Sequence, residues 1–456
     1  MKILFVHPNF PGPFAALAAH LAADTNHTVL ALVAAQTEPV ATWQGVTLVA
    51  CPAPRTAATE LHPWLQEIER QTLRAEAACQ VALQLQAQGF APDVIIAHPA
   101  WGDSLFLKEI WPQAKLGLYA ELFYQPDSIA AGFDPEFPAT SPLTGAALRL
   151  KNLPHWLHWQ EMDAAFSPTQ WQADSFRPAL SPQQHISVIR EGIDTQALAP
   201  KPDISLTLGG QLTLTRQQEV VTFASRTLEP CRGFHVFMRC LPELLRLRPQ
   251  AQIIIAGGSD GGYGPRPANG QSWHEWLVQA LQPQLAPEDW ARVHFVGRVP
   301  HASFIGLLQL SSVHVYLSYP FVLGRSLLEA MSVGCAIVGS DTAPVREVLQ
   351  HEHNGLLVNF FDSAALAQTV ADLLADSAQR QRLGAQARQW VQTHADLHQV
   401  TLPQQLQWLQ ALATGAIPAT ASQEPTQQPA TQAWAELANL RQSLAELRAL
   451  LQDPAA

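Results

Sequence analysis

The sequence predicts an α/β protein with two doubly wound, Rossmann-like domains, whose parallel sheets face each other across a cleft. Two observations predict this fold. Short runs rich in Val, Ile and Leu alternate with longer segments of helical periodicity, as in parallel sheets that are buried on both faces. The alternation stops near residue 195 and restarts near 218, so the unit is repeated. Ligands of such sheets bind at the carboxyl ends of the strands, which predicts a site in the cleft.

The N-terminal Rossmann-like domain is predicted to span residues 1–195. It begins with KILFV, which we interpret as a first strand and not as a signal peptide, because no long apolar region with a cleavage site follows. Its predicted helices are 13–23 and 63–88. Its predicted strands are 2–6, 27–34, 45–51, 92–98, 114–121, 163–169 and 185–194.

The C-terminal Rossmann-like domain is predicted over 218–400, after an irregular stretch at 195–217, with 211–218 as a short polar connection. Its strands are expected at 220–226, 251–258, 292–299, 312–319 and 336–341. A terminal helix is expected at 401–414. The following residues, 415–433, are rich in Pro, Thr, Gln and Ala and are expected to form a flexible linker.

The last segment, 434–452, carries leucines at a spacing of three and four residues in turn. This spacing predicts a helix with the apolar seam of a short coiled coil. Such a helix is marginal alone, because isolated helices need roughly 12–15 residues or packing to persist. Two interpretations have equal weight: homo-oligomerisation or docking on a partner protein, and folding back onto the rest of the chain.

Composition excludes several classes of function. The formal net charge of −11 argues against nucleic acid as a partner, although it is compatible with a local basic pocket for a small phosphate. No apolar window approaches the roughly 18 residues of a membrane span. The five cysteines form no CxxC pair, so we expect a reducing, cytoplasmic setting or one at the inner face of the membrane. HExxH is absent, so no metal site is expected, and we expect no hydrolase triad.

Arginines and glycines lie at the ends of predicted strands. In ASRTLEPCRGF, Arg226 ends a strand and Arg232 precedes a glycine and a helix. Two guanidiniums beside a helix N-terminus would form a diphosphate site, and the alternative is a pair of solvated loop arginines. Gly12 and Gly258 would let the backbone approach a ligand closely, although ordinary turns use glycine too.

Two further residues stand out because of their surroundings. His98 follows a predicted buried strand, so a functional role there has the same weight as a structural one. Glu329 is the one carboxylate in the apolar middle of YPFVLGRSLLEAMSVGCAIVGSD. Burying an ionised glutamate is expensive unless another group uses it.

Four segments together resemble the GT-B glycosyltransferases of the retaining family 4 (group 1) type, over roughly residues 1–400. ASRTLEPCRGF is similar to the family's GRLxxEKG segment, with Arg232 one residue displaced from the lysine. VIREGID is similar to VIPNGVD, HFVGRV to the strand before the nucleotide base, and NGLLV to the C-terminal run. The HPNFPG and YPFVLxxSLLEAM segments resemble one subgroup of the family.

The resemblance implies a nucleotide-sugar site. It gives catalytic roles to Arg226 and Arg232, which would stabilise the leaving diphosphate, and to His98, which would orient the donor sugar. The family has two glutamates separated by seven residues. Glu329 matches the second, which binds the ribose, whereas Phe321 stands at the first. The other residues for which the resemblance implies donor contacts are Gly12, Gly258, Gly297, Arg298, Leu323, Gly324 and Arg325.

The resemblance also implies an activity. A sugar would pass from a nucleoside-diphosphate sugar to a glycan, lipid-linked or protein acceptor, with retention of configuration and without a metal or other cofactor. Acceptor contacts are expected from Asp103, Glu121, Tyr124 and Asp127 in the N-terminal domain. The segment 146–160 mixes Leu, Trp, Lys and Arg, and we expect it either to touch a membrane surface or to bury its aromatic face.

Alternatives stay open. The missing first glutamate motivates a catalytically weak or silent subunit that binds an active partner through 434–452. A nucleotide-sugar 2-epimerase is less favoured, because no acidic catalytic cluster is evident. For Glu329, the alternative to a ribose contact is an ion pair with Arg325, four residues earlier on the same helix.

Overall fold

The computed structural model describes residues 1–35, 41–52, 60–125, 132–138, 143–180, 184–260 and 270–416, with positions 55, 56, 58, 262 and 267. These residues belong to one compact unit, Met1–Ile417. Asp127, the predicted linker beyond residue 416 and the predicted helix 434–452 lie outside the described residues.

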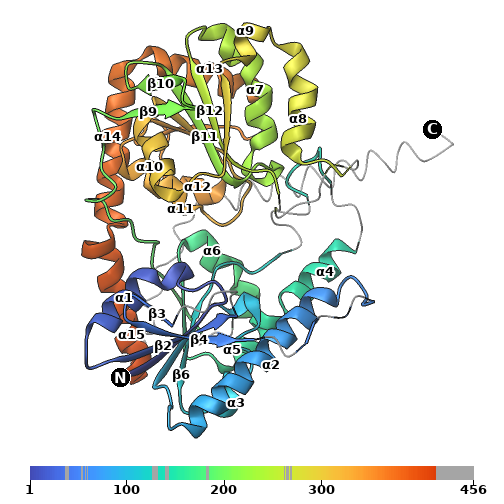
Figure 1. Cartoon of the computed structure of the whole chain (residues 1–456), viewed down its shortest axis with the longest axis vertical. Helices are drawn as coiled ribbons and strands as arrows, with labels where there is room; N and C mark the ends of the chain where they lie inside the picture. Colours follow the sequence, from blue (N-terminus) through green and yellow to red (C-terminus); the bar gives the residue numbers. More distant parts are fainter. Residues whose placement is uncertain are drawn as a thin grey trace, which may run out of the picture. The chain divides into compact units, whose positions relative to one another are not determined.

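The described chain forms two α/β domains with parallel sheets, which confirms the predicted fold class (Figure 1). The first sheet has eight strands in the order β3-β4-β2-β1-β5-β6-β7-β8, and β3 is the strand that runs antiparallel to its neighbour. Its strands are β1 (Lys2–Val6), β2 (Thr28–Ala34), β3 (Thr42–Trp43), β4 (Val46–Cys51), β5 (Val94–Ala97), β6 (Lys115–Tyr119), β7 (Ala164–Ser167) and β8 (Ile186–Val188).

Helices cover the first sheet because its central strands are apolar on both faces; every residue of β5, for example, is buried. The helices are α1 (Ala15–Ala23), α2 (Gln66–Ala87), α3 (Leu107–Ile110), α4 (Thr144–Lys151), α5 (Leu153–Glu161) and α6 (Gln170–Ser175). Single turns of tighter helix are η1 (Gly12–Phe14), η2 (Pro99–Trp101) and η3 (Arg177–Ala179).

The second sheet has six parallel strands in the order β13-β12-β11-β14-β15-β16. These are β11 (Val220–Thr227), β12 (Gln252–Gly258), β13 (Val293–Gly297), β14 (Val313–Tyr316), β15 (Ile337–Ser340) and β16 (Leu356–Val358). Its helices are η4 (Pro230–Arg232), α7 (Phe234–Leu247), α8 (Trp273–Leu281), η5 (Gln282–Gln284), α9 (Pro287–Trp290), α10 (His301–Leu310), α11 (Arg325–Ser332), α12 (Ala343–Arg346), α13 (Ser363–Ala375) and α14 (Ser377–His394).

The expectation of an irregular stretch at 195–217 is wrong in part. The structure has an antiparallel hairpin there, formed by β9 (Ser205–Leu208) and β10 (Leu212–Thr215). Gly209 and Gly210, between the strands, both have positive φ, the backbone that a tight hairpin turn requires. The leucines of the hairpin pack on the core beneath β11 and β12, so the alternation of Leu and Thr in the sequence marks a half-buried sheet.

The chain returns to the N-terminal domain after α14. A π-helical turn, η6 (Leu397–Thr401), leads into α15 (Leu402–Thr414), which packs against β6 and α1 (Figure 1). The Trp408 ring lies 4.7 Å from the ring of Phe166, and a Cβ at Gly117 would lie 2.5 Å from Trp408. The glycine in β6 therefore makes room for this helix, which belongs to the first core although it follows the second domain in sequence.

Candidate functional site

A cavity of about 290 Å³ lies at the carboxyl ends of β11, β12 and β13, beside the start of α11. Arg226, Gly297 and Arg298 line it, so the structure brings three of the predicted residues together. The other lining residues are Ala224, Ser225, Ala256, Gly257, Val299, Phe304 and Ser326. Its volume is near the lower end of the range for ligand pockets, which is about 300 to 1,000 Å³, so it can hold a large part of a small ligand.

The two arginines of this cavity differ in whether other protein groups bind their guanidiniums. Arg226 is exposed, and within the described residues its guanidinium makes no hydrogen bond or ion pair, so it is available to an anion. Arg298 is held by Asp260, whose carbonyl and carboxylate oxygens lie 3.0 and 3.2 Å from Nη2. Gly258 is not part of the lining. A Cβ there would lie 2.3 Å from Arg298 Nε, so the glycine makes room for that side chain.

Arg232 is half-buried and its orientation is fixed by the protein. Its Nη1 donates to Ser318 Oγ at 3.3 Å and to the Val322 carbonyl at 3.2 Å. The guanidinium also lies 5.1 Å from the ring centroid of Phe321, within cation–π range. Gly233, which follows, has a φ of +71° that favours glycine and starts α7 at this point.

Phe321, at the position of the family's first glutamate, is buried and packs on Leu122 of the N-terminal domain. Tyr124, Trp171 and Val322 surround this pair. A phenyl ring cannot accept a hydrogen bond from a hydroxyl group in the way a carboxylate does. The two domains therefore meet through an apolar contact here, and a carboxylate for a ligand has to come from another position.

Glu329 lies on α11 with 5% of its side chain exposed. Its Oε1 accepts hydrogen bonds from His301 Nε2 at 2.9 Å and Arg325 Nε at 3.1 Å, so the expected ion pair with Arg325 is present. Within the described residues Oε2 makes no hydrogen bond, which leaves one oxygen for a ligand. Gly324 begins α11 without a side-chain cap, so the positive end of the helix dipole is not neutralised.

Leu323 and Gly324 lie between Arg232 and Glu329 in the structure and are held through their backbone. The Leu323 N–H donates to Gln172 Oε1 at 3.3 Å, and the Gly324 N–H donates to the Tyr316 hydroxyl at 2.8 Å. The first of these bonds joins the two domains, because Gln172 belongs to α6. The segment that precedes α11 is therefore fixed on both sides.

The N-terminal domain contributes a group around His98, directly after β5. His98 Nδ1 accepts a hydrogen bond from the Ala100 N–H at 3.3 Å, so Nε2 carries the proton and faces Glu121 Oε2 at 3.4 Å. Both ring nitrogens are thus engaged, and Glu121, with 45% of its side chain exposed, is the member of the pair that can meet a ligand. Partial burial alone would raise the pKa of Glu121, but the hydrogen bond from His98 and nearby positive charge lower it.

His7 follows β1 as His98 follows β5, and the two rings lie 5.6 Å apart. Burial, helped by His98, lowers the pKa of His7 to about 4, so its ring is neutral near pH 7. Gly12 belongs to this group and not to the cavity beside Arg226. It has a φ of +49°, and a Cβ there would lie 2.8 Å from the His7 ring, so the glycine lets η1 pass close to the imidazole.

The other two described acceptor candidates lie apart from the His98 pair. Asp103 is buried with its Oδ2 3.4 Å from Arg74 Nη1, and burial raises the pKa of its carboxyl group. Tyr124 packs near Phe321, with Lys151 Nζ 3.8 Å from its ring centroid. Of the three, Glu121 is the one that is paired with His98.

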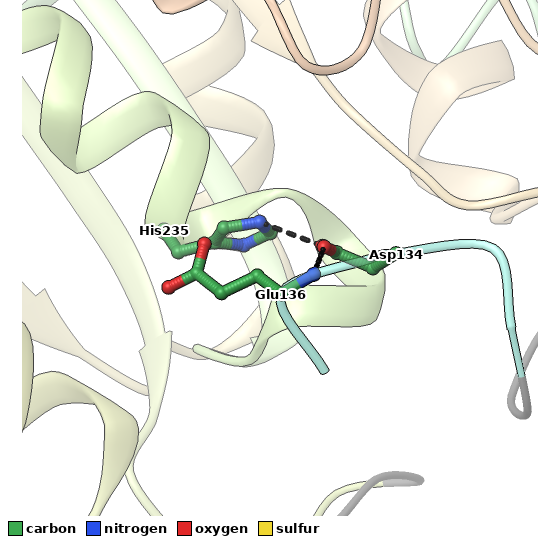
Figure 2. A group of neighbouring side chains, drawn as sticks. All are labelled: Asp134, Glu136 and His235. Carbon is green, nitrogen blue, oxygen red and sulfur yellow. Dashed lines mark hydrogen bonds and ion pairs between the residues drawn. The ribbon is translucent and has the colours of Figure 1, made fainter. Parts of the chain in front are cut away.

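A separate cluster joins Asp134 and Glu136, on the segment 132–138, to His235 on α7 (Figure 2). Asp134 Oδ2 lies 3.0 Å from His235 Nε2 and accepts a hydrogen bond of 2.7 Å from the Tyr319 hydroxyl. Glu136 accepts two hydrogen bonds of 2.6 Å from Arg239. These residue types also bind metals, but both carboxylates accept hydrogen bonds from protein donors, and His235 Nε2 is paired with Asp134. The cluster therefore attaches the segment 132–138, which follows β6 in the sequence, to the C-terminal domain.

Sequence reasoning missed His7, Glu191 and His301. His7 follows a buried strand, so the rule that selects His98 also selects it. Glu191 lies within VIREGID, where the resembling segment has another residue type, so comparison of motifs passes over it. No sequence signal marks His301, because its partner Glu329 lies 28 residues away.

Comparison with known proteins agrees with this geometry. Residues 25–198 match the glycosyl transferase family 4 group, and residues 211–390 match glycosyl transferases group 1. Spore coat protein SA of Bacillus subtilis is 27% identical over 38% of this chain and 43% of its own length. D-inositol 3-phosphate glycosyltransferase of Corynebacterium efficiens is 26% identical over 44% of this chain and 46% of its own length. The chain thus spans about half the length of the curated relatives it matches.

The fold is shared with solved structures. HepE of Anabaena, in complex with UDP and glucose, superposes with a TM-score of 0.62 at 19% identity, over 90% of this chain and 100% of that chain. The two family matches cover most of the present chain, one on each domain, and their boundary at 198–211 lies between the two parallel sheets. The chain belongs to the GT-B glycosyltransferases of the family 4, group 1 type.

Proposed function

We propose that this protein transfers a sugar from a nucleoside-diphosphate sugar to a hydroxyl acceptor, with retention of configuration and without a metal ion. The observation that carries the proposal is the meeting of three groups around the start of α11. These are a free Arg226 at the cavity, a fixed Arg232 bonded to the segment before α11, and Glu329 one turn into the helix. Two cations and a carboxylate suit a ligand that carries a diphosphate and a pentose.

The cavity beside Arg226 supports binding of the nucleoside. Val299 and Phe304 give it apolar walls against which a base can pack, and Gly297 leaves its backbone open to close approach. The unbonded Oε2 of Glu329 is a suitable acceptor for ribose hydroxyls. The UDP bound to HepE, a protein of the same fold, agrees with a nucleotide ligand.

The proposed reaction breaks the bond between the anomeric carbon and a diphosphate oxygen, and its electron pair stays on the diphosphate. Arg226 and Arg232 stabilise that negative charge, and the start of α11 adds the positive end of its dipole. The acceptor oxygen attacks on the face from which the diphosphate leaves and forms the new C–O bond. Its proton passes to the departing diphosphate, so no enzymic nucleophile or metal is required.

We propose that the acceptor binds to the N-terminal domain, where Glu121 is partly exposed beside His98. The α4–α5 segment buries one of its tryptophans and exposes the other. Trp159 is buried, whereas Trp156 and Leu157 are exposed, and Lys151 ends the preceding helix. Apolar side chains next to a cation suit a membrane surface and an acceptor carried on a lipid. Within the described residues, no helix has both the length and the apolar composition needed to cross a bilayer.

A thermal-shift panel of UDP, GDP and ADP with their hexose conjugates tests the proposal. A ligand at 100 times its Kd adds about 2.7 kcal/mol of stability, which is a readily measured shift. Arg226→Ala should lose most of the shift. Arg246→Ala should keep it, because that arginine is exposed on α7 and paired with Glu243. No stabilisation of the unmodified protein by any member of the panel would refute a nucleotide-sugar site.

Phe321 is the specific observation that favours the second candidate, a GT-B subunit without activity. A donor-hydrolysis assay on the nucleotide sugar that binds best separates the two. Turnover that Arg226→Ala abolishes supports an active transferase. Tight binding without turnover, in the presence of an acceptor panel, would favour the silent subunit.

A further inference from the structure

Glu191 lies after β8, in the segment that leaves the N-terminal domain, and the expected site does not include it. Its Oε1 accepts a hydrogen bond from the Tyr119 hydroxyl at 3.3 Å. The Tyr119 ring lies 5.5 Å from the ring of His98. Glu191 is therefore held in place by a residue that also contacts the His98–Glu121 pair.

Glu191 lines a small cavity whose opposite wall belongs to the C-terminal domain. Thr169 and Arg190 lie on the same side as Glu191, and Leu323 and Arg325 lie on the other. The cavity holds about 10 Å³, which is room for roughly one water molecule or one hydroxyl group. A ligand would therefore reach Glu191 with a single polar group and not with a whole ring.

Opposite charges act on each other across this cavity without direct contact. Arg325 attracts the Glu191 carboxylate, yet among the described residues no ion pair joins the two, because Arg325 Nε is bonded to Glu329. Burial raises the pKa of Glu191 against the pull of Arg325, and the charges of Glu121 and Glu329 add to the rise. A half-buried carboxyl group with an unused oxygen is stabilised by a hydroxyl that fills the gap.

We propose that Glu191 determines donor-sugar specificity by accepting a hydrogen bond from one hydroxyl of the sugar that is transferred. This inference rests on the proposed function. Arg226 and Arg232 take the diphosphate in the proposed function, so the attached sugar lies near the carboxylates of the N-terminal domain. The charge of Glu121, one of these carboxylates, already acts on Arg232, which agrees with this placement. Phe321 offers no acceptor, whereas Glu191 Oε2 makes no hydrogen bond within the described residues.

The test compares a nucleoside diphosphate with its hexose conjugate by isothermal titration calorimetry. The probes are UDP with UDP-glucose, GDP with GDP-mannose and ADP with ADP-glucose, and the pair used is one that the unmodified protein binds. In Glu191→Ala, the Kd of the conjugate should rise at least tenfold, while the Kd of the diphosphate alone changes less than twofold. Glu191→Gln keeps one acceptor oxygen and should give an intermediate rise. Tyr119→Phe, which removes the positioning hydroxyl, should give a smaller rise of the same kind.

Glu243→Gln is the matched control, since that glutamate is exposed on α7 and paired with Arg246. Equal weakening of both probes in the Glu191 variants would overturn the proposal, because Glu191 would then support the nucleotide or the domain contact. An unchanged Kd for the conjugate would also overturn it and leave the proposed function standing. If the unmodified protein binds no probe, the proposed function itself fails, and this inference with it. If Glu191→Ala does not fold, the test uses Glu191→Gln, because glutamine has nearly the same shape as glutamate.

Discussion

Replacing Glu329 with alanine separates its two possible roles, a ligand contact and an ion pair of the fold. The substitution removes the unbonded Oε2, the oxygen we assign to the ribose. Losing a hydrogen bond to a charged group costs about 1–3 kcal/mol, so the Kd of the nucleoside diphosphate should rise roughly 5- to 150-fold. The estimate counts the loss of one hydrogen bond to the ligand, because one carboxylate oxygen of Glu329 has no protein partner among the described residues.

The effect of the same substitution on stability should be small. The partners of Glu329 are largely exposed, with 62% of the His301 side chain and 50% of the Arg325 side chain accessible to water. Both partners are therefore solvated when the carboxylate is removed, and no unpaired charge stays buried. Pairs of this kind contribute about 0–1 kcal/mol, so the free energy of unfolding should change by about 1 kcal/mol or less.

Calorimetric titration with the nucleoside diphosphate measures the first quantity, and urea denaturation measures the second. Glu243→Ala serves as the control, because it also removes a glutamate that is paired with an arginine on a helix. An unchanged Kd in Glu329→Ala, together with a large loss of stability, would show that the carboxylate serves the fold alone. That result would refute the assignment of Glu329 to the ribose.

Three further predictions test other parts of the molecule. Arg226→Ala should lower kcat about 100-fold, the usual cost of one preorganised charge-stabilising donor, with little change in the melting temperature; full activity would remove it from the site. Trp408→Ala should destabilise the protein by about 3–5 kcal/mol in urea denaturation, because the indole packs on Phe166 in the first core; a loss below 1 kcal/mol would mean that α15 is not part of that core. Replacing Trp156 and Leu157 together with serine should reduce co-sedimentation with anionic vesicles severalfold and leave nucleotide binding intact; equal sedimentation would exclude this surface.

The sequence predicts the regular parts of this fold well because periodicity is a local property. The apolar runs at 2–6 and 220–226 correspond closely to β1 and β11, since strands buried on both faces need continuous apolar residues. The hairpin at Ser205–Thr215 carries an equally local signal, a Gly-Gly turn between two runs that alternate Leu and Thr. The polar residues of this segment favour an irregular connection, but the alternation of Leu and Thr predicts the hairpin that forms.

The candidate site is predictable only where a residue's role follows from its place on one strand or helix. Arg226, Gly297 and Arg298 lie at strand ends, and strand ends of a parallel sheet meet at one edge, so their convergence could be expected. The bond between Tyr319 and Asp134 spans 185 residues, and the pairing of Tyr119 with Glu191 spans 72. The first contact depends on how the two domains pack and the second on how the first domain folds, and no local pattern records either.

Phe321 explains why the carboxylates of the proposed site are divided between the domains. Its ring fills the space beside Arg232 and packs on Leu122, so the C-terminal domain contributes an apolar surface where a carboxylate would otherwise attract the guanidinium. Arg232 consequently has no anionic partner in its own domain among the described residues, so its charge is available for the diphosphate that we propose as ligand. The N-terminal domain holds the complementary groups, Glu121 and Glu191, each fixed by a neighbour of its own domain. The proposed donor bridges cations on one domain and carboxylates on the other, so it gains its full binding energy only when the domains are close. Close domains also exclude water from the reaction, and recognition of the sugar is therefore linked to exclusion of water.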